Sequence, residues 1–431
     1  MKNIRKSFLM TSKNIERSSA IWNMAGSMLS AFQSVIMLIV LSRVVSDELV
    51  GIYTMGNVSA NLFLFIGKYG MRGFQVSDVK NTYSFKDYHM TRVISSIMMI
   101  IVSVVYTLYS AHTVGYTSVK TQIIIWMCLM RVPEAYEDVY HGDYQKKGRL
   151  DIGAKCLTIR VAATLVLFGT LVVITRNLLS SLIIATIFTY VFMVVLLYLT
   201  RNMLDEKNGK GVLSRKNVTA LFIAVFPIFL AMFLSNYLGA APKNSIDRFM
   251  DDSIQAIYGY ISMPVFVVGL LASVIFNPIL LRTSCMWNEG KFKDFIKTVF
   301  QQAVYVLGIT VVCLIGAYLL GVPVLSFMYN KDLAPYKTDL LLIVVGSGFL
   351  AMATLFMNIL TIMREQKLIL AGYIIVAAAA FLLSDKVVLS YEMRGAVWFY
   401  VILLVALSVF YGAAFGIKYK KYVGGHHGIT G

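Results

Sequence analysis

Four ionisable residues directly follow an apolar run in the first half of the sequence. Residues 131 to 138 read RVPEAYED and place Arg131, Glu134, Glu137 and Asp138 beside the run IIIWMCLM. On a helical wheel Arg131, Glu134 and Asp138 share one stripe, and Glu137 lies at its edge. Guanidinium groups hold phosphate oxygens through paired, charge-assisted hydrogen bonds, whereas carboxylates can bind protons or cations. The stretch is therefore suited to anion binding or to ion coupling. Which of the two applies depends on the partners that the surrounding helices supply to these side chains.

The composition indicates a polytopic membrane protein. Of the 431 residues, 58% are hydrophobic and 14% are charged, and the mean hydropathy is +0.72. A soluble domain has roughly a quarter of its residues charged. The net charge of +17 would favour nucleic acid in a soluble chain. In a membrane protein the basic residues instead set the orientation, so we expect no nucleic-acid partner.

Apolar runs long enough to cross ~30 Å of hydrocarbon predict about twelve membrane-spanning helices. The first run is too long, and lies too far from the start, for a cleaved signal peptide. The predicted spans are Ser19–Leu41, Gly51–Met71, Val93–Ala111, Val119–Tyr140, Ile152–Ile174, Leu178–Leu199, Val218–Gly239, Ile254–Leu281, Phe295–Leu320, Leu340–Met363, Leu368–Leu383 and Ala396–Ile417.

The basic residues predict that both termini are cytoplasmic. With the N-terminus inside, most of the 39 Lys and Arg residues fall in cytoplasmic segments, as the positive-inside rule requires. The four cysteines lie in or beside spans and have no metal-binding spacing. We expect them to be reduced packing residues, and we expect no metal site and no cofactor.

A weak internal repeat predicts two lobes. Shifting the chain by 205 residues aligns SRVVSDELVGIY (42–53) with DRFMDDSIQAIY (247–258), so that Arg43 meets Arg248 and Asp47 meets Asp252. Both stretches form the outer turn after the first span of a half. The interval holds six spans, an even number, so the halves share one orientation, and such parallel repeats usually hold a substrate site between them. We therefore predict a six-helix lobe at 1–200, a basic cytoplasmic linker at 201–216 and a second six-helix lobe at 217–431.

Two arginines lie deep in neighbouring predicted spans. At 1.5 Å per residue, Arg131 and Arg160 lie roughly 13 Å and 12 Å from the cytoplasmic ends of their helices. Arginines at such depth mostly face the bundle interior or an aqueous cavity. The alternative is a structural ion pair between Arg131 and Glu134, although no acidic residue lies near Arg160 in the sequence. Pro133, which lies between Arg131 and Glu134, would loosen the helix backbone there.

Two longer stretches resemble a known transporter family. The turn SRVVSDELVGIY, followed by a glycine-bearing span that ends in KYGMRGFQVSD, is similar to the polysaccharide flippase branch of the multidrug/oligosaccharidyl-lipid/polysaccharide exporter superfamily. APKNSIDRFMDDSIQAIYGYISMP (241–264) resembles the matching turn of its second lobe. The resemblance covers most of the chain but contains no catalytic signature.

The resemblance implies an all-α polytopic membrane protein with two six-helix lobes forming a V around a cationic central cavity. Family members flip undecaprenyl-diphosphate-linked oligosaccharides to the outer leaflet of the bacterial plasma membrane by alternating access. Related lipid II flippases generally carry two further spans, which favours the polysaccharide branch. Partners would be the lipid-linked oligosaccharide, membrane lipids, and the polymerase and glycosyltransferases of the same pathway.

Several charged residues become candidates for this transport. The expected diphosphate ligands are cavity cations, and the expected gating or ion-coupling groups are carboxylates. The cations are Arg131 and Arg160, then Lys68 and Arg72 lower in the path, and Arg43, Arg248 and Lys243 at the outer end. The carboxylates are Glu134 and Asp138 in the fourth span and Asp47, Asp247 and Asp252 at the outer turns. Lys68 also lies close enough to the end of its span to reach the interface instead.

Two other classes compete with the flippase. A drug or cation antiporter of the same superfamily should have an acidic cavity, which Glu134, Glu137 and Asp138 leave open. A polysaccharide polymerase or glycosyltransferase is disfavoured because no large outer loop is present, so we expect no enzyme. The sequence also lacks the GxxxxGK[ST] phosphate loop of ATP-hydrolysing proteins. We expect the membrane potential, protons or sodium ions to drive transport.

Overall fold

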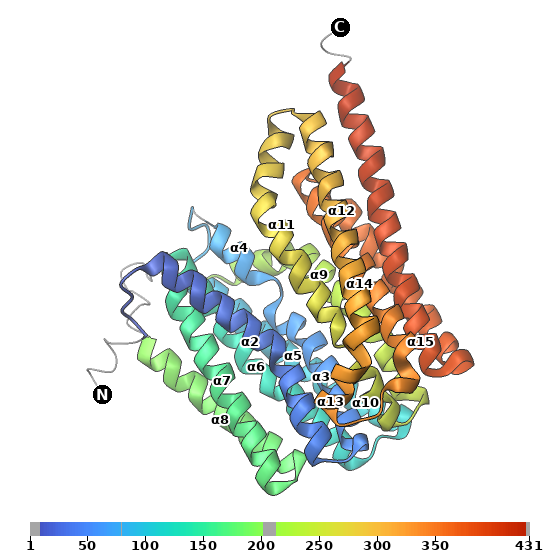
Figure 1. Ribbon diagram of the computed structural model, residues 1–431. Coiled ribbons are helices and arrows are strands. Elements are labelled where there is room, and N and C mark those ends of the chain that lie inside the picture. The colour runs from blue at the N-terminus through green and yellow to red at the C-terminus, as the bar shows by residue number, and fades with distance from the viewer. Residues whose placement is uncertain (1–8, 79, 201–212, 428–431) are drawn as a thin grey trace. The chain divides into compact units, whose positions relative to one another are not determined.

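A computed structural model describes residues 9–78, 80–200 and 213–427 of the chain, and every regular element among these residues is a helix. Contacts divide the chain into two compact units, Met1–Phe233 and Leu234–Gly431. The helices are labelled in Figure 1. Most of the predicted linker at 201–216 lies outside the described residues.

The first unit is built around one central helix, α6. This helix packs against α3, α4, α5, α7 and α8, and α2 packs along α7. A helix enclosed in this way is shielded from lipid, which allows it to carry charged side chains. The helices are α2 (Ile15–Val44), α3 (Asp47–Lys68), α4 (Met71–Ser77), α5 (Phe85–Ser110), η1 (Ala111–Gly115), α6 (Ser118–Lys146), α7 (Leu150–Thr175) and α8 (Leu178–Thr200).

The boundary between the compact units falls inside helix α9 (Arg215–Phe249). Asp87 accepts hydrogen bonds from the Ser214 backbone N–H at 3.0 Å and from the Asn217 amide at 3.1 Å. The Tyr69 ring stacks on Phe229 with centroids 4.5 Å apart. These contacts hold the first half of α9 to the first unit. Domains at 1–200 and 217–431 stay a prediction.

The second unit also has a central helix, α14, which packs against α11, α12 and α15. Its helices are the second half of α9, α10 (Asp252–Ile261), α11 (Pro264–Asn288), α12 (Phe292–Gly316), η4 (Ala317–Gly321), α13 (Val322–Tyr329), η5 (Ala334–Tyr336), α14 (Lys337–Ile362) and α15 (Gln366–His427). The predicted span Ile254–Leu281 is divided between α10 and α11, because Pro264 has no N–H to continue the helix. Helix α15 contains the last two predicted spans, with a break at Glu392.

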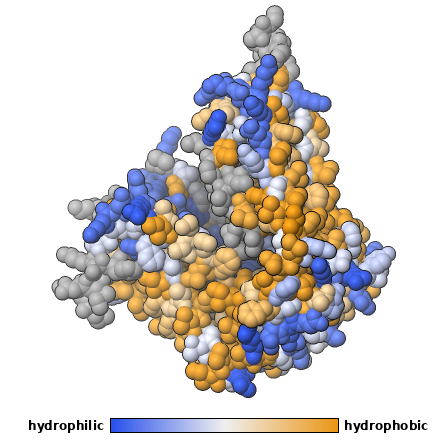
Figure 2. Space-filling model, viewed as in Figure 1, coloured by the Kyte–Doolittle hydropathy of each residue, from blue (hydrophilic) through white to orange (hydrophobic). Residues whose placement is uncertain are grey.

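Among the described residues, nine helical segments are long and apolar enough to cross a membrane. Helix α6 is not one of them because it is too polar, and α15 counts once although it holds two predicted spans. Including α6, α11 and the second part of α15 accounts for the roughly twelve spans expected from hydropathy. On the face shown in Figure 2, hydrophobic side chains cover the middle of the helices and hydrophilic ones gather near helix ends. The chain is a multi-pass membrane protein.

Two local features shape the helices around α6. Pro133 lies inside α6, and the Leu129 carbonyl, which a non-proline residue would bond, accepts a hydrogen bond from the Tyr190 hydroxyl at 3.1 Å. Between α3 and α4, Tyr69 and Gly70 adopt left-handed conformations with φ of 48° and 65°. This break places Lys68 and Arg72 on either side of a sharp change in chain direction.

Asp78 fixes the chain after α4. Its carboxylate accepts hydrogen bonds from the N–H groups of Thr82 and Tyr83 at 2.9 and 3.1 Å and from the Tyr88 hydroxyl at 3.1 Å. Burial by itself would raise the pKa of Asp78, but these hydrogen bonds outweigh it and hold the pKa below its usual value.

Gly70→Val should destabilise the first unit. A β-branched residue is disfavoured at positive φ, by about 1–2 kcal/mol, and a Cβ at this position would lie 2.9 Å from Ile228 Cγ2 of α9. We expect a lower midpoint of thermal unfolding in detergent. The matched control is Gly73→Val, because no atom lies within 4 Å of a Cβ there. Equal midpoints for the two variants would show that the break does not require glycine.

Candidate functional site

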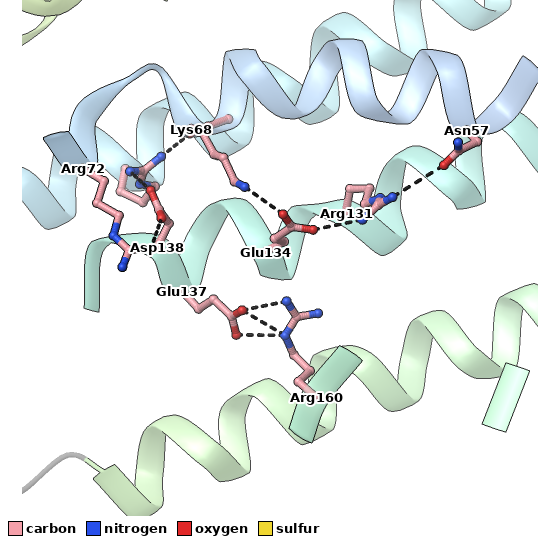
Figure 3. A network of polar contacts seen from close by, with 10 residues as sticks. Asn57, Lys68, Arg72, Arg131, Glu134, Glu137, Asp138 and Arg160 are labelled. Atoms are coloured by element: carbon pink, nitrogen blue, oxygen red, sulfur yellow. Dashed lines mark hydrogen bonds and ion pairs between the residues drawn. The ribbon is translucent and has the colours of Figure 1, made fainter. Parts of the chain in front are cut away.

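The polar face of α6 lies against α3, α4, α5 and α7. Arg131, Glu134, Glu137 and Asp138 all come from this helix, and their partners come from its neighbours (Figure 3). The described contacts join them to Asn57, Lys68, Arg72, Arg92 and Arg160. Each carboxylate of the network therefore has at least one cationic partner from another helix.

Glu134 is shared by two cations, a group we call the first triad. Lys68 Nζ lies 2.7 Å from Glu134 Oε1, and Arg131 Nη1 lies 3.0 Å from Glu134 Oε2. Arg131 also donates to the Asn57 side-chain oxygen at 3.5 Å. The Arg131–Glu134 pair is the structural alternative considered from the sequence. The Lys68 side chain is 29% exposed, and its ammonium bonds to Glu134 inside the lobe.

Asp138 is also shared by two cations, which form the second triad. Arg92 Nη2 lies 2.9 Å from Asp138 Oδ2, and Arg72 Nη1 lies 3.4 Å from Asp138 Oδ1. Arg72 further donates to the Gln145 side-chain oxygen at 3.0 and 3.2 Å. Arg92 is fully buried and donates to the Gly67 carbonyl at 2.7 Å.

Arg92 was missed from the sequence because it immediately precedes a predicted span and reads as a loop residue. A usable signal was present, since buried polar side chains follow it along one face of α5 at helical spacing. They are Ser95, Ser96, Ser103 and Thr107. A charged residue at the end of such a stripe is expected to point into the protein.

Arg160 forms a buried ion pair with Glu137. Its Nη2 lies 2.6 Å from Glu137 Oε1, and its Nε donates to both carboxylate oxygens at 3.0 and 2.9 Å. The two side chains are only 4% and 3% exposed. Arg160 therefore has the acidic partner that the sequence did not reveal, one helix away from it. A substrate-binding role for Arg160 stays a prediction.

A small cavity lies beside Arg131 within the first unit. Its volume is about 20 Å³, and its lining includes Gln33, Asn57, Tyr53 and Thr164. Such a volume holds about one water molecule. It can hydrate the guanidinium group, but it cannot admit an oligosaccharide.

The candidates at the predicted outer turns lie in both units. In the first unit Arg43 lies in the last turn of α2 and is exposed, and Asp47 begins α3. In the second unit Arg248 pairs with Asp385 at 2.7 Å, and Asp385 also accepts from the Ser245 hydroxyl at 2.6 Å.

The remaining outer candidates belong to α9 and α10. Lys243 lies over the Tyr258 ring, 5.9 Å from its centroid, and Asp247 is buried. Asp252 lies in the first turn of α10. Asp385 was not selected from the sequence, because nothing nearby in the chain marks it as the partner of Arg248. The gating role of these residues stays a prediction.

Comparisons with known proteins identify the fold. No protein-family model and no curated protein matches the sequence. Among solved structures, an inward-facing multidrug resistance MATE family transporter of the MOP superfamily aligns with a TM-score of 0.65 and 12% identity over 98% of both chains. The lipid II flippase MurJ, in an inward closed conformation, aligns with a TM-score of 0.70 and 15% identity over 92% of this chain and 87% of that chain. The chain has the transporter fold of MATE and MurJ proteins.

A third solved structure has the same fold. MATE in a bent conformation aligns with a TM-score of 0.57 and 11% identity over 94% of this chain and 95% of that chain. The all-α, multi-pass fold predicted from the sequence is thus confirmed, whereas the polysaccharide branch stays a prediction.

Arg160→Ala should reduce the amount of folded protein. Removing one partner of a buried ion pair leaves the other charge uncompensated, at a cost of about 3–5 kcal/mol. Fluorescence-detected size-exclusion chromatography should show aggregation or loss. The double variant Glu137→Gln/Arg160→Met should recover most of the signal, and Arg17→Ala on the exposed face of α2 should match the wild type. Normal folding of Arg160→Ala would argue against a structural role for the pair.

Proposed function

We propose that the protein is a flippase that moves oligosaccharides linked to a lipid diphosphate from the cytoplasmic to the outer leaflet by alternating access. The observation that best supports this proposal is the net charge of the network around α6. Its described members include five cations, Lys68, Arg72, Arg92, Arg131 and Arg160, but only three carboxylates, Glu134, Glu137 and Asp138. Each cation has a carboxylate partner, but the network keeps an excess of two positive charges, and such a net charge among apolar helices favours an anionic ligand.

The pairing of the carboxylates argues against the cation antiporter. A drug or cation site needs an acidic group that is available to the ligand. Glu134, Glu137 and Asp138 each lie within 3.0 Å of an arginine or lysine nitrogen. A cationic substrate would have to displace these partners.

The second unit supports the same conclusion by contrast. Its central helix α14 has the sequence KTDLLLIVVGSGFLAMATLFMNILTI, with charged residues only in its first turn. Of the two central helices, only α6 therefore carries charged side chains in its middle. A lipid-linked substrate also agrees with the likeness to the lipid II flippase MurJ.

Lys68 and Arg72 are the proposed direct ligands of the diphosphate. Their side chains are 29% and 30% exposed, the largest values among the five cations. Arg131 and Arg160 support the site from inside the lobe. Location in a bacterial plasma membrane, with both termini cytoplasmic, is part of the proposal, as is a supply of substrate from the glycosyltransferases of the pathway.

Lys68→Gln and Arg72→Gln should each slow flipping by at least tenfold, because each removes a diphosphate ligand. The measurement uses purified protein in liposomes with a fluorescent polyprenyl-diphosphate sugar and a membrane-impermeant quencher. Lys86→Gln is the matched control, since Lys86 is exposed near the start of α5 and outside the network. Wild-type transport of a cationic dye but not of the diphosphate lipid would overturn the proposal in favour of the antiporter.

The membrane potential should drive the flipping. The diphosphate carries about two negative charges, and each charge that crosses 100 mV is worth about 2.3 kcal/mol. Outward movement of this dianion, away from a negative interior at 100 mV, is therefore favoured by roughly 4–5 kcal/mol. We expect flipping to increase with a potential set by valinomycin at constant pH. Flipping that is unchanged at zero potential, but stops without a proton gradient, would instead assign the coupling to Glu134 or Asp138.

A further inference from the structure

The two triads on α6 share one design. In each, a carboxylate of α6 lies between a half-exposed cation near the α3–α4 break and an arginine that is more deeply buried. In the first triad the Lys68 side chain is 29% exposed and that of Arg131 is 12% exposed. In the second triad Arg72 is 30% exposed and Arg92 is 0% exposed.

The chain geometry repeats this arrangement one helical turn apart. Glu134 and Asp138 are four residues apart on α6 and therefore lie on the same face. Lys68 ends α3, and Arg72 lies in the first turn of α4. The break between these helices is fixed from within, because the Gly67 carbonyl accepts from both Arg92 and the Ser95 hydroxyl at 2.7 Å.

Sharing a carboxylate between two cations changes what each cation can do. A buried carboxylate with a single partner cannot release it without becoming an uncompensated charge. A carboxylate with two partners can release one and stay neutralised by the other. In both triads the exposed member is the one that an incoming ligand can reach.

The Glu137–Arg160 pair lacks this design. Both side chains are almost completely buried, and the guanidinium contacts both carboxylate oxygens. No second cation bonds to Glu137 in the part of the chain that the structure describes. The pair is therefore suited to stability rather than to exchange.

We propose that the triads are anion-exchange sites, in which phosphate oxygens take Lys68 and Arg72 from Glu134 and Asp138 while Arg131 and Arg92 keep those carboxylates neutralised. This inference deepens the proposed flippase function and rests on it. Arg92 does not touch the substrate. It is a positioning residue, which keeps Asp138 from competing with the diphosphate for Arg72.

Charge-compensated variants test the role of Arg92. In Arg92→Gln, Asp138 has Arg72 as its remaining cation in the triad and should hold it more tightly. Binding of farnesyl diphosphate to the protein in nanodiscs, measured by calorimetry, should weaken about tenfold. Adding Asp138→Asn to this variant removes the competing carboxylate and should restore the affinity to within about threefold of wild type. Farnesyl monophosphate, titrated in parallel, reports how much of the affinity comes from the second phosphate.

The outcomes separate the inference from the function. If the double variant binds as weakly as Arg92→Gln, Arg92 acts only through the Gly67 carbonyl and the exchange role is wrong, while wild-type binding still supports the flippase. If Arg92→Gln does not fold, Arg131→Gln and Arg131→Gln/Glu134→Gln make the same comparison in the first triad. If the wild type does not bind diphosphate, both the function and the exchange role fail.

Discussion

The structure of the first unit depends on one constraint, which is that charge placed among apolar helices must be neutralised by other protein groups. Helix α6 contributes half of the charged residues of the network, including all three carboxylates, and α3, α4, α5 and α7 pack around it and supply the opposite charges or the hydrogen-bond partners. The packing of the helices and the ion pairs are therefore inseparable. A helix with this many ionisable residues would not be stable in lipid by itself.

The central helices of the two units differ in their chemistry. The repeat predicted from the sequence relates their outer turns, where Arg43 corresponds to Arg248 and Asp47 to Asp252. It does not extend to the central helices, since the middle of α14 is uncharged whereas α6 carries Arg131, Glu134, Glu137 and Asp138.

Hydropathy predicted the helices well because the requirement to cross hydrocarbon acts on each segment separately. It could not predict α9 as a helix shared by both units, because that feature depends on contacts with neighbouring elements. The site was predicted less completely. Arg131 and Glu134 are close in sequence and were recognised as a possible pair, whereas Arg160–Glu137 and Arg92–Asp138 are 23 and 46 residues apart and form only through folding.

Pro133 was expected to loosen α6. The Leu129 carbonyl, which the proline cannot bond, instead accepts a hydrogen bond from the Tyr190 hydroxyl of α8. Neighbouring groups often satisfy the backbone around a membrane proline in this way. The consequence concerns how the sequence can evolve. A residue with an N–H at position 133 would restore the helix bond and make the tyrosine hydroxyl redundant, whereas loss of the hydroxyl alone would leave the Leu129 carbonyl unsatisfied. Positions 133 and 190 are therefore expected to change together in related chains, with the proline lost before the hydroxyl.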